Sequence, residues 1–194
     1  MIDNSGWLDN AQKTPSPNFN ERPAGEVPRL VVIHNISLPP GQFGGDYVEQ
    51  FFTNQLNTGD HPYFSEIKDL KVSAHVFIKR TGDAVQFVSF NDRAWHAGRS
   101  CYLGVPECND YSIGIELEGT DTSDFTKAQY LSLKEIVGAI HARYPLTRNH
   151  MAGHSDISPG RKTDPGEKFN WHRFRLELKD AALEDQTDKD QTAE

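Results

Sequence analysis

Apolar positions gather in short blocks along the chain, and the spacing within each block predicts its secondary structure. Residues 30–34 are apolar and β-branched and are bounded by prolines, a pattern typical of a buried central strand. His34 stands at the carboxyl end of this run, where open sheets commonly carry their sites. Residues 111–118 alternate, with Glu116 on the polar face of the predicted strand. A mid-strand carboxylate flanked by apolar residues is unusual without a partner.

Two more strands are expected at 72–79 and 84–90, because both runs are rich in β-branched and aromatic residues. The residues between them, 80–83, suit a hairpin turn. These two strands therefore form an antiparallel pair in the predicted sheet.

One long helix and two shorter ones are predicted. Over 126–144 the apolar residues recur at helical spacing, and Thr126 and Gln129 can form a capping box. Shorter helices are expected over 47–56 and 170–180. No internal repeat interrupts this series of elements.

The order of these elements favours a single α/β (α+β) domain with a central mixed β-sheet flanked by helices. The domain is expected to span 1–178, followed by an acidic, flexible tail over 179–194. Apart from its one helix, segment 37–71 is expected to be a long, glycine-containing loop that borders the site and moves over it.

Charge and composition narrow the possible partners. Of the formal net charge of -8, residues 177–194 contribute -5, which leaves -3 for residues 1–176. Such a body lacks the basic face that nucleic-acid binding needs. No apolar run approaches the roughly 18 residues of a membrane helix, and the first residues lack the pattern of a signal peptide. We therefore expect a cytoplasmic protein that acts on a small molecule, with no membrane association and no obligate protein partner.

The two cysteines, Cys101 and Cys108, lie seven positions apart. A cytosolic chain rarely keeps a disulfide, and no C-x-x-C spacing supports a zinc pair. Both are expected to be free thiols.

Segment 153–166 concentrates side chains that can do chemistry. Its fourteen residues include one His, two Asp, one Arg and one Lys, together with three Gly and two Pro that argue against a regular helix or a long strand. Such a loop on a rigid scaffold is typical of functional segments. We expect Asp156 to hold the shape of the loop through backbone hydrogen bonds.

Common hydrolase motifs are missing: the sequence has no G-x-S-x-G elbow, no H-E-x-x-H helix and no Gly-rich phosphate loop. Histidines near acids remain. His34, His154 and Asp164 could supply the two nitrogens and one oxygen of a catalytic zinc site with an open position. Each histidine could equally be structural, and His75 and His96 carry the same ambiguity.

The chain also contains four blocks, His34–Gly41, Arg93–Gly98, Ile113–Asp121 and Gly153–Gly166, that occur in the same order in a known family. Together they resemble the AmpD-type 1,6-anhydro-N-acetylmuramoyl-L-alanine amidases, cytoplasmic zinc enzymes of cell-wall recycling. These belong to the wider superfamily of N-acetylmuramoyl-L-alanine amidases and peptidoglycan recognition domains. The resemblance runs from about Gly6 to Leu178.

The resemblance implies roles for nine residues of this sequence. The zinc ligands would be His34, His154 and Asp164, the last standing where the wider superfamily often has Cys. Glu116 and Lys162 would be catalytic, and the substrate contacts would be Asn35, Lys71, Trp95 and Arg161. Lys71 stands where close relatives carry Arg, which keeps the charge but loses bidentate carboxylate pairing.

The implied roles are chemically coherent. Zinc lowers the pKa of its water to about 7. Glu116 can take the proton and pass it to the leaving amine, while zinc and Lys162 stabilise the oxyanion. The bond cut would join the lactyl group of an anhydromuramoyl sugar to L-Ala. Arg161 and Lys71 could bind peptide carboxylates, and Trp95 could pack on the sugar.

The resemblance further implies that this reaction limits the signals that induce β-lactamase. Two alternatives stay open from the sequence. One is a binding module of the same fold that recognises muropeptides without cutting them. The other is an amidase outside the cytoplasm that acts on intact wall, which would need an export signal.

Overall fold

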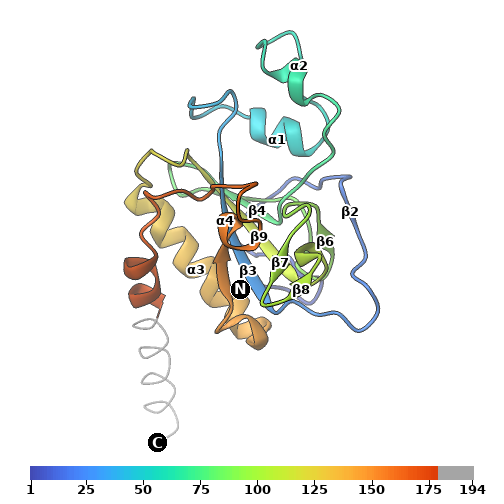
Figure 1. Ribbon diagram of the computed structural model, residues 1–194, viewed down its shortest axis with the longest axis vertical. Helices are drawn as coiled ribbons and strands as arrows, with labels where there is room; N and C mark the ends of the chain where they lie inside the picture. Colours follow the sequence, from blue (N-terminus) through green and yellow to red (C-terminus); the bar gives the residue numbers. More distant parts are fainter. Residues whose placement is uncertain (179–194) are drawn as a thin grey trace, which may run out of the picture.

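A six-stranded mixed sheet forms the centre of residues 1–178, the part of the chain that the computed structural model describes (Figure 1). Its strands lie in the order β1–β5–β4–β9–β3–β10. They are β1 Gln12–Lys13, β3 Leu30–Ile36, β4 Val76–Ile78, β5 Ala84–Gln86, β9 Ser112–Glu118 and β10 Met151–Gly153. Within this sheet only β4 and β5 pair in the antiparallel sense, so the predicted mixed sheet and the predicted hairpin are confirmed.

Helices and short strands surround this sheet. They are α1 Tyr47–Phe52, α2 Phe64–Ile67, α3 Lys127–Arg143 and α4 His154–Ile157, the 3-10 turns Cys108–Asp110 and Pro145–Thr147, and the strand pairs β2 Phe19–Asn20 with β6 Arg93–Ala94 and β7 Cys101–Tyr102 with β8 Val105–Pro106. Residues 171–178 are also helical. The predicted tail, 179–194, lies outside the described residues.

Helix α3 covers one face of the sheet (Figure 1). The predicted capping box is confirmed, since the Thr126 side chain accepts from the Gln129 amide and the Gln129 side chain accepts from the Thr126 amide. Buried side chains of α3, including Leu133 and Val137, pack against the apolar face of β3 and β9. Each large apolar side chain buried in this way contributes about 1.5–3 kcal/mol.

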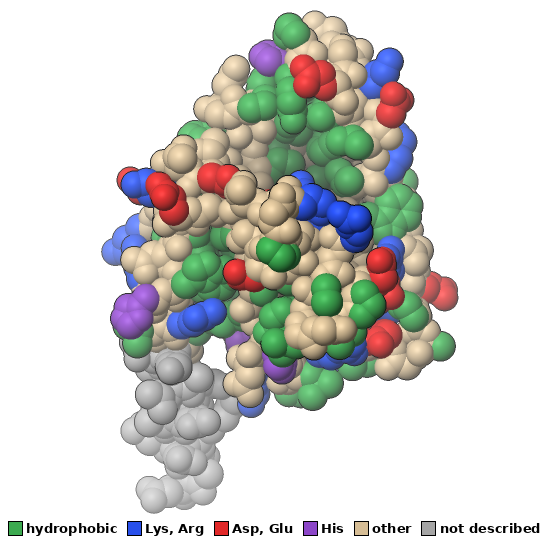
Figure 2. Space-filling view, viewed as in Figure 1, with side chains coloured by type: hydrophobic (Ala, Val, Ile, Leu, Met, Phe, Trp, Pro, Cys, Tyr) green, Lys and Arg blue, Asp and Glu red, His purple; other side chains and the backbone are tan. Residues whose placement is uncertain are grey.

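The opposite face of the sheet carries a second layer. Aromatic residues of α1 and α2, with Phe52 and Phe64 fully buried, pack on Phe77 of β4 and on the residues that follow β5. These helices form a lobe above the sheet, and hydrophobic side chains reach the surface there (Figures 1 and 2). Leu70, beside this lobe, is 51% exposed. The movement of segment 37–71 stays a prediction.

The structure corrects several predicted elements. Helix 47–56 ends at Phe52, and α2 forms in a segment expected to be loop. The strands expected at 72–79 and 84–90 are shorter, Val76–Ile78 and Ala84–Gln86, and the His75 ring accepts the amide proton of Gly114 just before β4 begins. Strand β10 was not predicted; it is three residues long and exists through its pairing with β3.

Two smaller expectations can be compared with the described residues. Cys101 is exposed, Cys108 is buried, and both are free thiols, as predicted. Among the helices of residues 1–178, none has both the length and the apolar character needed to cross a membrane.

Candidate metal centre

Three parallel strands bring His34, His154 and Glu116 to one edge of the sheet. His34 near the end of β3 pairs in register with Glu116 of β9. Gly153 at the end of β10 pairs with Ile33, so the next residue, His154, lies beside His34. Paired residues of a sheet project their side chains to the same face. His34 and Glu116 therefore share the face opposite α3, because Ile33 and Ile115 fill the face that α3 covers.

The segment 153–166 is shaped by its own backbone. One helical turn, α4, forms before Pro159, so the expectation of a helix-free segment was wrong over these four residues. The Asp156 carboxylate accepts from the Gly153 amide at 2.7 Å, which confirms its predicted part in holding the loop. The carbonyl of Asp164 accepts from the Ser155 amide at 2.9 Å, which brings the far end of the segment back to α4.

Three candidate ligand atoms form a nearly equilateral triangle. His34 Nδ1 lies 3.0 Å from His154 Nδ1 and 3.0 Å from Asp164 Oδ2, and His154 Nδ1 lies 3.1 Å from the same oxygen. His34 and His154 are buried, and Asp164 is partly exposed. This His-His-Asp group can hold a metal ion.

The surroundings of His34 and Asp164 favour the protonation states in which these side chains bind metals. Burial lowers the pKa of His34 to about 4, although the neighbouring Asp164 opposes that shift. Burial alone would raise the pKa of Asp164, but the adjacent His154 and His34 rings outweigh it and hold the pKa well below its usual range. A neutral imidazole and an ionised carboxylate are the forms that bind metals.

Two residues of the 93–98 block form hydrogen bonds with Nε2 of His34 and of His154, the ring nitrogen that points away from the triangle. His34 Nε2 lies 2.9 Å from His96 Nδ1, and His154 Nε2 donates to the Ala97 carbonyl at 3.0 Å. Burial lowers the pKa of His96 well below its ordinary value. The sequence left the role of His96 open; its position after a tryptophan in a loop was the only signal.

Glu116 presents a buried carboxyl group to this centre. Its side chain is 9% exposed, and Oε2 has no hydrogen-bond partner among the described residues. Burial raises the pKa of Glu116 well above its usual value, the Asp164 charge raises it further, and Lys162 opposes both. This free oxygen suits a group that receives a proton. Lys162 itself is exposed.

The four residues matched to substrate contacts lie at different distances from the triangle. Asn35, next to His34, donates to Asp121 at 2.8 Å. Arg161 donates to the carbonyls of Ala97 and Arg99 at 2.6 and 2.8 Å. Within residues 1–178, no hydrogen bond joins Trp95 or Lys71 to the ligand triangle: the indole of Trp95 donates to Asn20, and Lys71 is exposed between α2 and β4.

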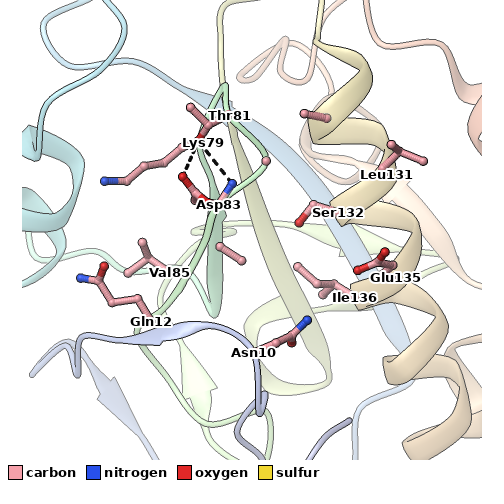
Figure 3. Close-up of a pocket in the computed structure, with 13 residues that line it drawn as sticks. Asn10, Gln12, Lys79, Thr81, Asp83, Val85, Leu131, Ser132, Glu135 and Ile136 are labelled. Carbon is pink, nitrogen blue, oxygen red and sulfur yellow. Dashed lines mark hydrogen bonds between the residues drawn. The ribbon is translucent and has the colours of Figure 1, made fainter.

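A separate cavity of about 560 Å³ lies between the β4–β5 hairpin and α3 (Figure 3). Lys79, Thr81 and Asp83 line it from the hairpin, and Ser132 and Glu135 line it from the helix. None of the residues of the ligand triangle lines this cavity, so the chemistry predicted from the sequence belongs elsewhere.

Comparison with known proteins gives consistent matches. Residues 24–167 match the family described as N-acetylmuramoyl-L-alanine amidase. The chain is 53% identical over 175 residues to the 1,6-anhydro-N-acetylmuramyl-L-alanine amidase AmpD of Citrobacter freundii, covering 90% of this chain and 94% of the relative. It is 52% identical over 176 residues to AmpD of Escherichia coli K12, covering 91% and 96%.

Solved structures agree with these sequence matches. A crystal structure of a selenomethionine AmpD derivative superimposes with a TM-score of 0.90 at 52% identity, covering 92% of this chain and 99% of the other. The Escherichia coli amidase AmiD, in complex with anhydro-N-acetylmuramic acid-L-Ala-D-γ-Glu-L-Lys as substrate, gives a TM-score of 0.57 at 26% identity, covering 91% and 65%. The single-domain fold predicted from the sequence is thus the fold of these proteins.

Proposed function

The chain belongs to the N-acetylmuramoyl-L-alanine amidase family, and from this premise we propose that it is a zinc-dependent amidase of peptidoglycan recycling. The bond hydrolysed joins the lactyl group of 1,6-anhydro-N-acetylmuramic acid to L-alanine in muropeptides. The observation that carries this proposal is the triangle of His34, His154 and Asp164 beside the buried carboxyl group of Glu116, whose Oε2 has no hydrogen-bond partner among the described residues. Relatives more than half identical to this chain bear the name of that activity.

Zinc fits the donor set. Two imidazole nitrogens and one carboxylate oxygen are borderline ligands that suit zinc, whereas magnesium and calcium prefer oxygen alone. Tetrahedral zinc with bonds of about 2.0–2.1 Å has ligand atoms about 3.3–3.4 Å apart. The triangle, with edges of 3.0–3.1 Å, needs to widen by only a few tenths of an ångström.

The catalytic parts can be assigned from the surroundings of each side chain. A bound zinc ion would supply Lewis-acid activation of water and of the scissile carbonyl. Glu116 would take a proton from the attacking water and return it to the departing amine of L-alanine. Burial raises its pKa, which makes it a stronger base than an exposed carboxylate. Lys162 would stabilise the negative oxygen that develops on the carbonyl carbon.

The substrate contacts follow the charges of a muropeptide. Stem peptides carry free carboxylates, which Arg161 and Lys71 would bind by charge-assisted hydrogen bonds. Asn35, fixed by Asp121, would place a polar side chain next to His34. Trp95 would offer an apolar ring to the sugar. By consuming anhydromuropeptides the enzyme would limit the signals that induce β-lactamase.

Zinc analysis combined with product analysis tests the proposal. The purified protein is assayed for metal and incubated with anhydro- and non-anhydro-muramoyl tripeptides, and the products are identified by mass spectrometry. We expect one zinc per chain, release of the tripeptide from the anhydro substrate, and loss of activity on chelation. Full activity after chelation would overturn the metal mechanism.

The same assay separates two alternatives. Binding of the anhydro substrate without cleavage would identify a recognition module of the same fold. Equal rates on both sugars would remove the anhydro preference and leave a general muramoyl amidase.

A further inference from the structure

We propose that the dipeptide His96–Ala97 is a positioning element that orients both histidine ligands at once, with His96 as its principal residue. The inference rests on the proposed zinc centre. His96 faces the back of the His34 ring, and the carbonyl of Ala97 faces the back of the His154 ring. Neither residue would touch the metal or the substrate.

The hydrogen-bond directions follow from the ligand positions. Nδ1 of His34 points into the triangle, so its lone pair would bind the metal and the neutral ring would carry its proton on Nε2. That N–H donates to His96 Nδ1 at 2.9 Å, which leaves the His96 proton on Nε2. His96 Nε2 lies 3.0 Å from Ser112 Oγ and donates to it. One chain of hydrogen bonds therefore selects the tautomer of His34.

The backbone around His96 is fixed from outside the site. The side-chain oxygen of Asn109 accepts from the amides of both His96 and Ala97, at 3.1 and 2.8 Å. Asn109 is buried and lies in the 3-10 turn before β9. A single amide side chain thus sets the position of the two groups that support the two histidine ligands.

Strand β9 leaves space for the His96 ring at Gly114. Gly114 faces the ring, and a Cβ atom on this residue would lie 2.3 Å from His96 Cγ. Ser112 precedes it by two positions on the same face and receives the ring proton. The His96 ring therefore packs on Gly114 and donates to Ser112. Glu116, two positions after Gly114, lies on the same face of β9.

An imidazole is an uncommon acceptor for a metal-bound histidine, since carboxylates, backbone carbonyls and water usually serve. A carboxylate at this place would raise the basicity of His34 and add negative charge to a centre that already holds Asp164. The neutral ring of His96 orients His34 without that charge. The expected consequence is a metal centre with stronger Lewis acidity.

Zinc affinity tests the role independently of catalysis. The variants His96→Leu and His96→Asn are compared by chelator competition, because Asn can present Oδ1 where the ring presents Nδ1. We expect His96→Leu to weaken zinc binding by about 10–100-fold and His96→Asn to recover most of that loss. His141→Leu is the control: His141 lies in the last turn of α3, which covers the opposite face of the sheet, so its loss can change stability but should spare zinc affinity.

Unchanged zinc affinity in His96→Leu, or equal losses in the Leu and Asn variants, would overturn the inference. Nitrogen NMR of the zinc-loaded wild-type protein supplies a second test that needs no variant. We expect His34 to carry a slowly exchanging proton on Nε2, and a proton on Nδ1 or rapid exchange at Nε2 would contradict the scheme. A protein that binds zinc in this way but cleaves no muropeptide would refute the proposed function and leave this inference standing.

Discussion

The Asp121 carboxylate accepts a hydrogen bond from the side-chain amide of Asn35 at 2.8 Å, which ties the residue after a candidate metal ligand to the loop that follows β9. The other carboxylate oxygen of Asp121 accepts from Thr163 Oγ1, next to Asp164. Gly166 approaches so closely that a Cβ atom there would lie 2.2 Å from the Cα of Asp121. Asp121 therefore connects β3 to the end of segment 153–166.

We expect Asp121→Ala to lower kcat/KM for the anhydromuramoyl tripeptide by about tenfold. Two hydrogen bonds with a net value near 1 kcal/mol each are lost, and both fix groups beside the centre. Steady-state kinetics check this result. Thr163→Val removes only one of the two bonds and should cost less. Native kcat/KM in Asp121→Ala would show that the loop holds its shape without this carboxylate.

Removal of a ligand and removal of the base should have different signatures. Asp164→Ala is expected to lose zinc, because only the two imidazole ligands of His34 and His154 remain. Glu116→Ala should keep zinc and lose about 10²–10⁴ in kcat, the usual contribution of a general base. Metal analysis of both purified variants, with their rates, checks the assignment. Equal zinc loss in both variants would make Glu116 a structural residue.

Much of this site could be predicted because its members lie in strongly patterned segments. His34 ends a β-branched run, Glu116 interrupts an alternating strand, and segment 153–166 combines charge with Gly and Pro. The resemblance to a known family then linked these distant segments. The structure adds the register that places His34 opposite Glu116 in adjacent strands.

What could not be predicted depends on contacts through space. Strand β10 consists of Met, Ala and Gly and has no strand pattern of its own; pairing with β3 creates it. The hydrogen bonds through His96 require a residue without a side chain at position 114, because a Cβ atom there would clash with the ring. The local sequence does not reveal this condition. Asn109 accepts hydrogen bonds from the amides of His96 and Ala97, thirteen and twelve positions before it. Each of these depends on a partner far away in the chain.

A gain of substrate binding is expected from Lys71→Arg. Lys71 is exposed, so the longer guanidinium can be accommodated, and its planar fork binds a carboxylate with two parallel hydrogen bonds. We expect KM for the tripeptide substrate to fall several-fold, by about 1 kcal/mol of added binding, with kcat unchanged. A substrate with its peptide carboxylates amidated is the control, and it should show no gain. The same gain on the amidated substrate would remove Lys71 from the carboxylate contacts.

The pH dependence of stability should carry a contribution from His141 in the last turn of α3. Burial lowers its pKa to about 4, with Arg148 adding to the shift, and its Nε2 has no hydrogen-bond partner among residues 1–178. An unfolded chain binds the proton near pH 6.5. As the pH falls from about 7 toward 4, the unfolded chain therefore takes up a proton that the folded chain refuses, and stability decreases. Above pH 7 the residue contributes nothing to this dependence.

We expect His141→Leu to lose less stability than the wild type between pH 7 and pH 5, by roughly 1 kcal/mol once partial solvent exposure of the ring is taken into account. Urea unfolding of zinc-free protein at the two pH values measures the difference, with zinc removed so that protonation of the ligand histidines affects all variants alike. His172→Leu, an exposed histidine in the helical segment 171–178, is the matched control and should follow the wild type. An identical loss of stability in His141→Leu and the wild type would show that the native ring takes up its proton as readily as an unfolded one.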